Sequence, residues 1–420
     1  MTDPLRPASL IGRQPVIDRE QQLLAYTLAD QEGWIAPLTD VPLTAEGADE
    51  ATPALGPYLT FIRADRDFLL GNLIEALPPA LTVIELRSDV PASQAVLERA
   101  SALREKGFAF LSMAPCPHAT ASDTPDAENT VCPLCAQATI IAVDLAGLAD
   151  QTALPGLIAQ TRQQHKRLLA RHVDNIDAFE RARQLGFDLF QGYAFAHPTI
   201  DTTQKLKPAQ ASLLRLLALV VEDADTPAIE EAIKIEPGLT LNLLRLTNSV
   251  GSGLSARITS LRHAITVLGR RQLQRWLQLL LYAGRHGETA GGTNALLQLA
   301  ATRGRLMELL AERVQPSNRE FADQSFMTGI LSLMPALLGV AMPTILAQLP
   351  VATRIARALT EKDGQLGYLI ALVEATESAD TEALSEALRH LPNVNIACIN
   401  NRLAQAMLWA STLGQAQAAD

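Results

Sequence analysis

Short apolar runs alternate with helical stretches over the first two hundred residues, and this alternation limits the possible folds more than any other feature of the chain. Three of the runs have the length and composition of buried strands: 81–86, 108–113 and 139–145. A helical stretch, 94–106, separates the first two. Strands that follow one another through helices pair in parallel, so the pattern predicts an α/β domain built on a barrel or an open sheet.

The pattern changes near residue 207. From there almost to the carboxyl terminus, apolar residues recur at three- and four-residue spacing, and no convincing strand interrupts them. Such spacing places the apolar side chains on one face of each helix, so this part is predicted to be all-α. The polar stretch 202–208 ends in a proline and is the expected linker. We therefore predict a first domain over residues 10–200 and a helical domain over residues 207–410.

Composition and charge narrow the class of protein. A chain of 420 residues, of which 48% are hydrophobic, can build two or three domains with substantial cores. Its net charge is −10 and its basic residues form no dense stripe, which argues against a nucleic-acid partner. The first residues lack the basic and apolar regions of a secretory signal, and no apolar run reaches the ~20 residues that span a bilayer. We expect a cytoplasmic protein with no membrane partner.

Three of the four cysteines lie near one another, together with one histidine, in a polar part of the chain. They form two close pairs: Cys116 with His118, and Cys132 with Cys135. These residue types and spacings suit a tetrahedral structural zinc site. The stretch between the pairs, 119–130, has no core-forming residues, so zinc would order it; the alternative is reduced thiols on a mobile loop. Cys398, in an apolar helical stretch, is expected to be a small core residue.

The stretch 186–198 is the most distinctive motif of the first domain. It reads Gly-Phe-Asp-Leu-Phe-Gln-Gly-Tyr-Ala-Phe-Ala-His-Pro and resembles the closing motif of the EAL family, the barrel phosphodiesterases that cleave cyclic di-GMP. The stretch 12–18 resembles the opening strand of the same family. The resemblance covers roughly residues 10–200, and it implies a TIM-like barrel with two divalent cations at its active site.

The resemblance also implies which residues occupy the active-site positions of the family, and most of them differ from the family's groups. The substituted positions are Thr27 for an acid, Arg63 for an asparagine, Met113 and Ala114 for paired aspartates, Ala142 for a lysine and Arg171 for the general base. The retained polar groups are Glu85, Asp144 and Gln191, and Asp174 is a conservative replacement of the second acid in the general-base motif. Two divalent cations need several carboxylate oxygens, and these residues supply too few. We therefore expect no catalytic residues, no catalytic magnesium or manganese, and no enzymatic activity.

Two stretches of the helical half, 232–249 and 258–269, together resemble the HDOD domain, a relative of the metal-dependent HD phosphohydrolases. The resemblance covers roughly residues 200–400. No His-Asp dipeptide occurs in the chain, so the metal pair of the HD enzymes is not expected, and His263 is interpreted as a structural histidine. Pro335 stands where relatives usually carry an acid, and it is expected to start or kink its helix.

Together these features predict a bacterial signalling scaffold in which a degenerate EAL-type barrel is fused to an HDOD domain. The helical domain is expected to contact other signalling proteins, and the barrel is the part that could take cyclic di-GMP. Two alternatives stay open. One is a sensor that binds cyclic di-GMP without hydrolysis, and the other is a weak residual phosphodiesterase.

Overall fold

The computed structural model describes most of the chain. The described residues are 12–28, 58–87, 90–114, 133–145, 154–197, 208–234, 260–283, 293–378 and 380–418. The chain packs into two compact units. The first contains Met1–Pro198, Ala290–Gln298 and Leu372–Asp420, and the second contains Thr199–Thr289 and Leu299–Ala371. The domain ranges 10–200 and 207–410 stay predictions.

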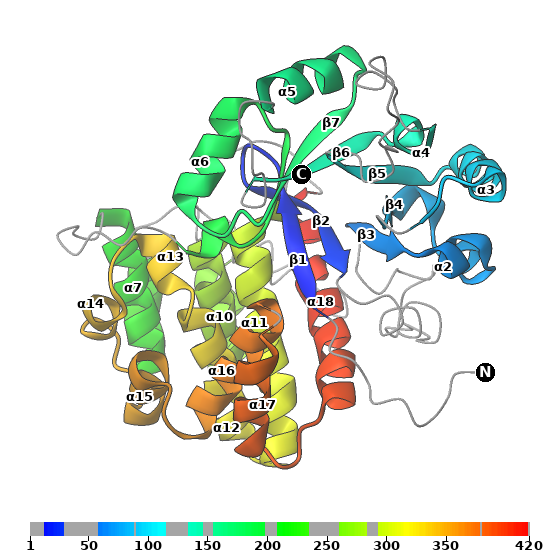
Figure 1. Cartoon of the computed structure of the whole chain (residues 1–420). Coiled ribbons are helices and arrows are strands. Elements are labelled where there is room, and N and C mark those ends of the chain that lie inside the picture. Colours follow the sequence, from blue (N-terminus) through cyan, green and yellow to red (C-terminus); the bar gives the residue numbers. More distant parts are fainter. Residues whose placement is uncertain are drawn as a thin grey trace. The chain divides into compact units, whose positions relative to one another are not determined.

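The first unit contains a closed barrel. Its eight strands are β1 (Arg13–Ile17), β2 (Gln22–Leu28), β3 (Leu59–Ala64), β4 (Thr82–Leu86), β5 (Ala109–Ala114), β6 (Ile140–Asp144), β7 (Arg167–Arg171) and β8 (Leu189–Gln191). Strands β2 to β8 pair in parallel in sequence order, and β1 closes the ring by pairing antiparallel with both β8 and β2 (Figure 1). A short further strand, β9 (Thr293–Asn294), pairs with β2. The predicted TIM-like barrel is therefore confirmed.

Helices follow most strands of the barrel, as the alternation predicts. The helices of this unit are α2 (Arg66–Leu70), α3 (Gln94–Glu105), α4 (Pro133–Gln137), α5 (Leu154–Gln163), α6 (Ile176–Leu185), α17 (Thr381–Arg389) and α18 (Ile396–Ala418), with the 3-10 turns η1 (Leu73–Ala76), η2 (Pro79–Leu81) and η5 (Ala194–Ala196). Local chemistry sets several of their ends. The Asp65 carboxylate accepts from the Phe68 N–H at the start of α2, and Gly186 ends α6 with φ 97°, a backbone conformation that favours glycine.

A layer of apolar side chains fills the barrel interior. Successive side chains of a strand point to opposite faces, so alternate residues face inward. The core layer consists of Val16, Ala25, Phe61, Val83, Leu111, Ile140, Ala142, Leu169 and Leu189. Its burial stabilises the ring and fixes which other residues of each strand face inward. The inward residues nearest the carboxyl ends of the parallel strands therefore share one end of the barrel, its mouth.

The second unit is helical, as predicted. Its described helices are α7 (Pro208–Val221), α8 (Thr226–Lys234), α10 (Leu261–Ala283), α12 (Arg319–Leu331), α13 (Met334–Leu338), α14 (Met342–Leu346) and α15 (Thr353–Glu361), with parts of α11 (Ala295–Val314) and α16 (Gly364–Ser378). Of the expected linker, 202–207 lies outside the described residues, and Pro208 begins α7. Pro335 lies in the first turn of α13, so the prediction that it starts a helix is confirmed.

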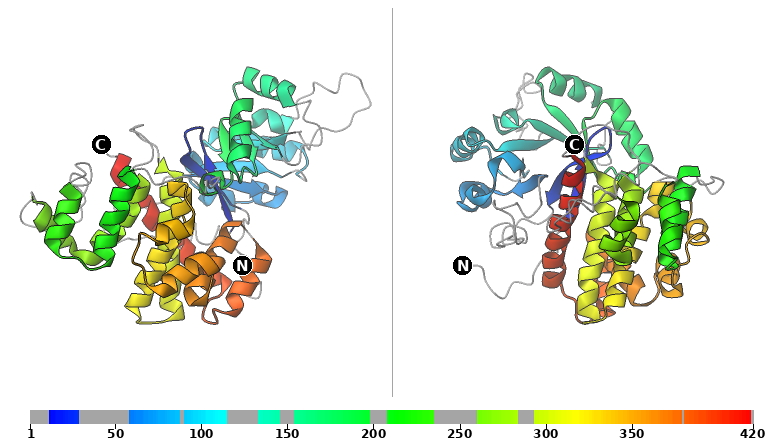
Figure 2. Two further views of the ribbon diagram at one scale, coloured as in Figure 1. Left: turned by 90° about the vertical axis from the view of Figure 1, so that its left-hand side faces the viewer. Right: turned by 180° about the vertical axis from the view of Figure 1, so that it is seen from behind.

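Two groups of helices form the packed parts of the second unit. The core of α7, α8 and α10 includes the buried Leu216, Ile229 and Ile265. The helices α10, α11 and α12 lie side by side (Figure 2), and the Tyr282 hydroxyl of α10 donates to the Ile330 carbonyl of α12 at 2.6 Å. In the described part of the chain, no helix combines the length and apolarity needed to cross a membrane.

Candidate functional site

Inward-facing side chains from all the strands of the ring form the mouth of the barrel, each two residues beyond a core residue. They are Gln14, Thr27, Arg63, Glu85, Met113, Asp144, Arg171 and Gln191. The β1 residue precedes its core residue because β1 runs antiparallel to its neighbours. We call this set the mouth layer. All its members except Gln14 are positions that the EAL resemblance singled out, so the fold brings those positions together.

Glu85 is the centre of the charged contacts in the mouth layer. Its Oε1 accepts from Arg63 Nε at 3.2 Å and from Arg171 Nη1 at 2.9 Å. Arg63 is the register partner of Glu85 on the adjacent strand, whereas Arg171 reaches Glu85 from β7. Glu85 and Arg171 are only 5% and 6% exposed, so their ion pair is nearly removed from water. Arg171 Nη1 also lies 3.2 Å from Met113 Sδ, and the buried Arg171 Nε has no hydrogen-bond partner among the described residues.

The other polar groups of the mouth layer make local contacts. Asp144 Oδ2 lies 3.1 Å from His172 Nδ1, and both side chains are partly exposed. Gln191 Nε2 donates to Gln14 Oε1, and the buried Thr27 Oγ1 has no hydrogen-bond partner in the described part of the chain. Sequence reasoning missed Gln14 and His172 as site residues. The alternation of inward and outward residues along β1 would have found Gln14, whereas no sequence signal marked His172.

Three positions of the resemblance lie outside the mouth layer. Ala142 belongs to the core layer beneath it. Ala114 follows Met113 directly on β5, so the two side chains point to opposite faces of the strand and only Met113 lines the mouth. Asp174 follows β7, and its Oδ1 accepts from the Tyr193 N–H at 3.1 Å. That contact ties the loop after β7 to the loop after β8.

The acids of the mouth do not fit a pair of divalent cations. Hard cations take several oxygen ligands each, and of the two acids in the mouth layer Glu85 already accepts from two guanidinium groups while Asp144 contacts His172. Over the residues that the structure describes, no three His, Cys, Asp or Glu side chains gather closely enough to hold a metal ion. The mouth instead presents two guanidinium groups around one carboxylate, a donor set that suits an anion.

The predicted zinc ligands lie largely beyond the described residues. Cys116, His118 and Cys132 are outside them. Cys135 lies on α4, but its side chain is not described. Zinc binding therefore stays a prediction. Cys398, expected in the core, is a free cysteine that is only half-buried on α18.

Only parts of the two HDOD-like stretches are described. Residues 232–234 end α8, residues 235–259 lie outside the described part, and 261–269 begin α10. His263 is exposed in the first turn of α10, where its backbone N–H donates to Ser260 Oγ at 3.2 Å. It is therefore a surface residue at a helix start.

Comparison with known proteins identifies the helical half. Residues 207–361 match the family model described as the HDOD domain. The chain is thus a barrel protein whose residues 207–361 match the HDOD domain, and the predicted order of a TIM-like barrel followed by a helical HDOD domain is confirmed.

Two curated relatives match the chain along nearly its whole length. The cyclic di-GMP phosphodiesterase CdgJ of Vibrio cholerae serotype O1 is 24% identical over 424 residues, which cover 96% of this chain and 93% of CdgJ. The uncharacterized protein YuxH of Bacillus subtilis (strain 168) is 26% identical over 392 residues, which cover 90% of this chain and 92% of YuxH. The chain is therefore related to a protein named a cyclic di-GMP phosphodiesterase.

Solved EAL structures match less than half of the chain. Klebsiella pneumoniae BlrP1, in a complex with calcium and cyclic di-GMP, is 15% identical with a TM-score of 0.33, and the match covers 46% of this chain and 57% of that one. An EAL domain protein from Listeria monocytogenes EGD-e is 15% identical with a TM-score of 0.30, and the match covers 44% of this chain and 86% of that one. The barrel itself is established by its strand order and closure.

The expectation that the chain is not an enzyme is wrong. It was drawn from the substituted active-site positions, but CdgJ, which is similar over 96% of the chain, is named a phosphodiesterase. A comparison of residue types at a few positions shows which groups have changed. It does not measure which activity the remaining groups support. The absence of these acids is a property of the composition of the mouth, and it does not decide whether the mouth is catalytically active.

Proposed function

We propose that the chain is a cyclic di-GMP signalling protein, whose barrel mouth binds the dinucleotide and whose helical domain passes the signal to other proteins. The observation that carries this proposal is the convergence of Arg63 and Arg171 on the single carboxylate of Glu85. The relationship to CdgJ points to the ligand, because cyclic di-GMP is part of the name of that protein.

Contacts between guanidinium and phosphate groups are the proposed basis of binding. An arginine stays charged at any working pH, and its forked N–H donors match the oxygens of a phosphate. Since two arginines share one carboxylate, this cluster keeps one positive charge that Glu85 does not neutralise. The Arg63 side chain is 41% exposed and open to a ligand, whereas the Arg171 side chain is 7% exposed and holds Glu85 in place. We infer that Arg63 meets a phosphate of cyclic di-GMP.

Hydrolysis of cyclic di-GMP is the second candidate function. The name of CdgJ, a relative along nearly the whole chain, is the observation that favours it. Binding at the mouth and turnover there are separate measurements on the same sample, so one experiment addresses both candidates.

A titration of labelled cyclic di-GMP against the full chain, with and without magnesium or manganese, tests both functions. Fluorescence polarisation reports binding, and chromatography reports the linear dinucleotide. Arg63→Gln should weaken binding by about tenfold or more, because a charge-assisted contact contributes roughly 1.5–3 kcal/mol. Arg104→Gln, a matched loss of charge at an exposed position in the last turn of α3, away from the mouth, should leave binding unchanged. No binding under any condition would contradict the proposal, whereas turnover that Glu85→Ala abolishes would establish hydrolysis.

The helical domain is proposed to contact other signalling proteins. Its match to the HDOD model over residues 207–361 supports a separate functional module. Cross-linking of the full chain in cells, at low and raised cyclic di-GMP, should join partner proteins to residues of this domain. Cross-links that map only to the barrel would overturn this part of the proposal.

A further inference from the structure

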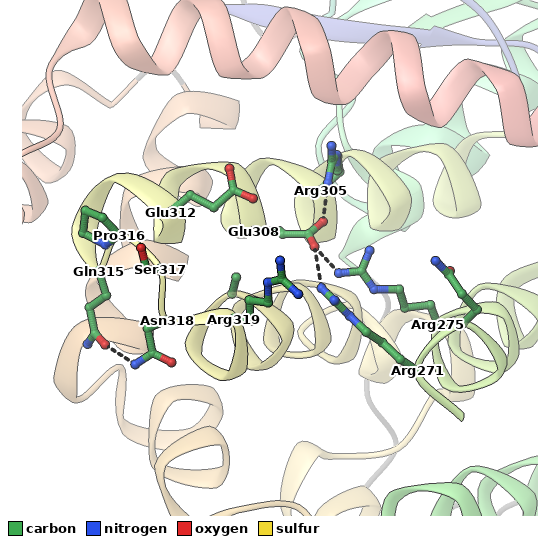
Figure 3. Close-up of a pocket in the computed structure, with 12 residues that line it drawn as sticks. Arg271, Arg275, Arg305, Glu308, Glu312, Gln315, Pro316, Ser317, Asn318 and Arg319 are labelled. Carbon is green, nitrogen blue, oxygen red and sulfur yellow. Dashed lines mark hydrogen bonds and ion pairs between the residues drawn. The ribbon is translucent and has the colours of Figure 1, made fainter. Parts of the chain in front are cut away.

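A polar pocket of about 660 Å³ lies within the second unit (Figure 3). Its walls come from α10, from α11 and from the start of α12. The charged residues that line it are Arg271, Arg275, Arg305, Arg319, Glu308 and Glu312. Its volume is within the range of small-molecule sites, but its lining is mostly charged or polar, whereas most such sites are largely apolar.

Three of the arginines converge on Glu308, which is 3% exposed. Arg305 Nη1 donates to Glu308 Oε2 at 2.6 Å, Arg275 Nη2 donates to Glu308 Oε1, and Arg271 Nη2 lies 3.7 Å from the same oxygen. Figure 3 shows these three side chains turned toward Glu308. A buried carboxylate that holds three guanidinium groups keeps them close together in spite of their mutual repulsion.

Asp323 and Phe326 of α12 hold the same arginines from another side. Asp323 Oδ1 accepts from Arg271 Nε at 2.6 Å and from Arg275 Nη2 at 3.1 Å. The Arg275 guanidinium carbon also lies 4.5 Å from the centre of the Phe326 ring. The arginines are thus fixed before any ligand arrives, which lowers the ordering cost of binding.

Positive charge is left over in this pocket. Its four guanidinium groups face two lining carboxylates and the adjacent Asp323, so one positive charge stays unmatched. Arg319 is the lining arginine that is open to a ligand: the side chain is exposed, and within the described part of the chain it makes no hydrogen bond or ion pair. Arg319 is also the first residue of α12, where the helix dipole adds a partial positive charge.

We propose that this pocket binds a small molecule that carries a diphosphate group. Guanidinium forks match phosphate oxygens, and Arg271 and Arg319 are exposed enough to reach a ligand. The lining residues include no aromatic side chain on which a base could stack, so the phosphates are the recognised group. This site belongs to the second unit and is independent of cyclic di-GMP binding at the barrel mouth.

Calorimetric titration of the full chain with inorganic pyrophosphate, and in parallel with adenosine diphosphate, tests the proposal. Arg319→Gln and Arg271→Gln should each raise the Kd by about tenfold, because each removes one charge-assisted contact. The Arg319 side chain is exposed and makes no hydrogen bond or ion pair among the described residues, so its replacement should leave the fold intact even if Arg271→Gln perturbs it. The control is Arg313→Gln, an equal loss of charge at an exposed position of α11 outside the pocket, and its Kd should stay unchanged.

The two ligands identify the source of the phosphates. Equal affinities support recognition of the diphosphate group alone, and tighter binding of adenosine diphosphate supports a nucleotide as the natural ligand. Binding of neither ligand by the unmodified chain would overturn the proposal. An equal loss of affinity in Arg313→Gln would overturn it too, because general attraction of anions would then explain the binding. Arg63→Gln should not affect either titration.

Discussion

At the scale of single residues, the buried pair of Glu85 and Arg171 makes the barrel mouth sensitive to substitution. Removing one partner of a buried ion pair leaves the other charge unpaired away from water and costs about 3–5 kcal/mol. Glu85→Met should therefore lower the free energy of unfolding much more than Arg63→Met, because the Arg63 side chain is 41% exposed and can be hydrated. Urea unfolding followed by circular dichroism measures both variants.

A double variant separates charge pairing from packing at the same place. Replacing both Glu85 and Arg171 by methionine removes the two charges together, so much of the stability lost in Glu85→Met should return. If the stability lost in the double variant equalled the sum of the losses in Glu85→Met and Arg171→Met, the two residues would not be coupled. The comparison is a second double variant, in which Glu85→Met is combined with Arg63→Met and the free energy of unfolding is measured in the same way.

The contacts of these residues could not have been predicted from the sequence. The EAL resemblance located Glu85 and Arg171, and the alternation of inward and outward residues was enough to place both in one layer. Their 2.9 Å contact, however, joins β4 to β7, two strands that are not neighbours in the ring. The distance across a barrel depends on strand tilt and stagger, which residue types do not encode directly.

At the scale of elements, the crossing of α11 and α12 depends on two glycines. A Cβ atom added to Gly329 would lie 2.8 Å from the Gly304 Cα atom and 2.9 Å from the Gly304 nitrogen. Both are backbone atoms, so the helices would have to move apart. Gly329→Ala should therefore destabilise the protein by about 1–3 kcal/mol, as measured by thermal or urea unfolding.

Gly156 on α5 is the matched control for that substitution. A Cβ atom there would meet no atom within 4 Å, so Gly156→Ala should be neutral or stabilise the protein by about 0.5–1 kcal/mol through helix propensity. Equal effects of the two substitutions would mean that the close helix crossing is not what Gly329 permits.

Elements with a strong periodic pattern were predictable, and those without one were not. The predicted strands 81–86 and 108–113 correspond to β4 and β5, and the predicted helix 94–106 corresponds to α3. The pair Thr293–Asn294 has no apolar alternation, so nothing in the residues indicated that β9 exists. Its strand conformation depends on its pairing with β2, a contact between residues far apart in the sequence.

At the scale of the whole molecule, zinc content is a direct test of the cysteine prediction. Protein purified without added metal should contain about one equivalent of zinc per chain, because two close pairs of soft or borderline ligands complete one tetrahedral site. Cys132→Ser should abolish the zinc signal in elemental analysis. Cys398→Ser should leave it unchanged, since Cys398 lies on α18 and outside the predicted set. Absence of zinc, with Cys132 and Cys135 freely alkylated, would leave the alternative of reduced thiols.

The first unit also depends on late segments of the chain. β3 pairs with β2 only from Ala25 onward, and β9 pairs with Gln22 and Leu23 at the start of the same strand. A fragment that ends at Lys205 lacks β9, so this part of β2 would have an uncovered edge. Amide hydrogen exchange should be faster at the start of β2 in the fragment than in the full chain, while β5 keeps its protection because both its neighbours are present. Equal exchange at β2 would contradict a role for β9.

The position of β9 has a consequence for how the protein is made. Ribosomes add roughly 5–20 residues per second, and domains near the amino terminus generally fold first. Strands β1 to β8 therefore leave the ribosome before β9 has been synthesised. During that interval the nascent barrel has an unpaired strand edge at Gln22 and Leu23, which can pair with other chains until Thr293 and Asn294 emerge and cover it.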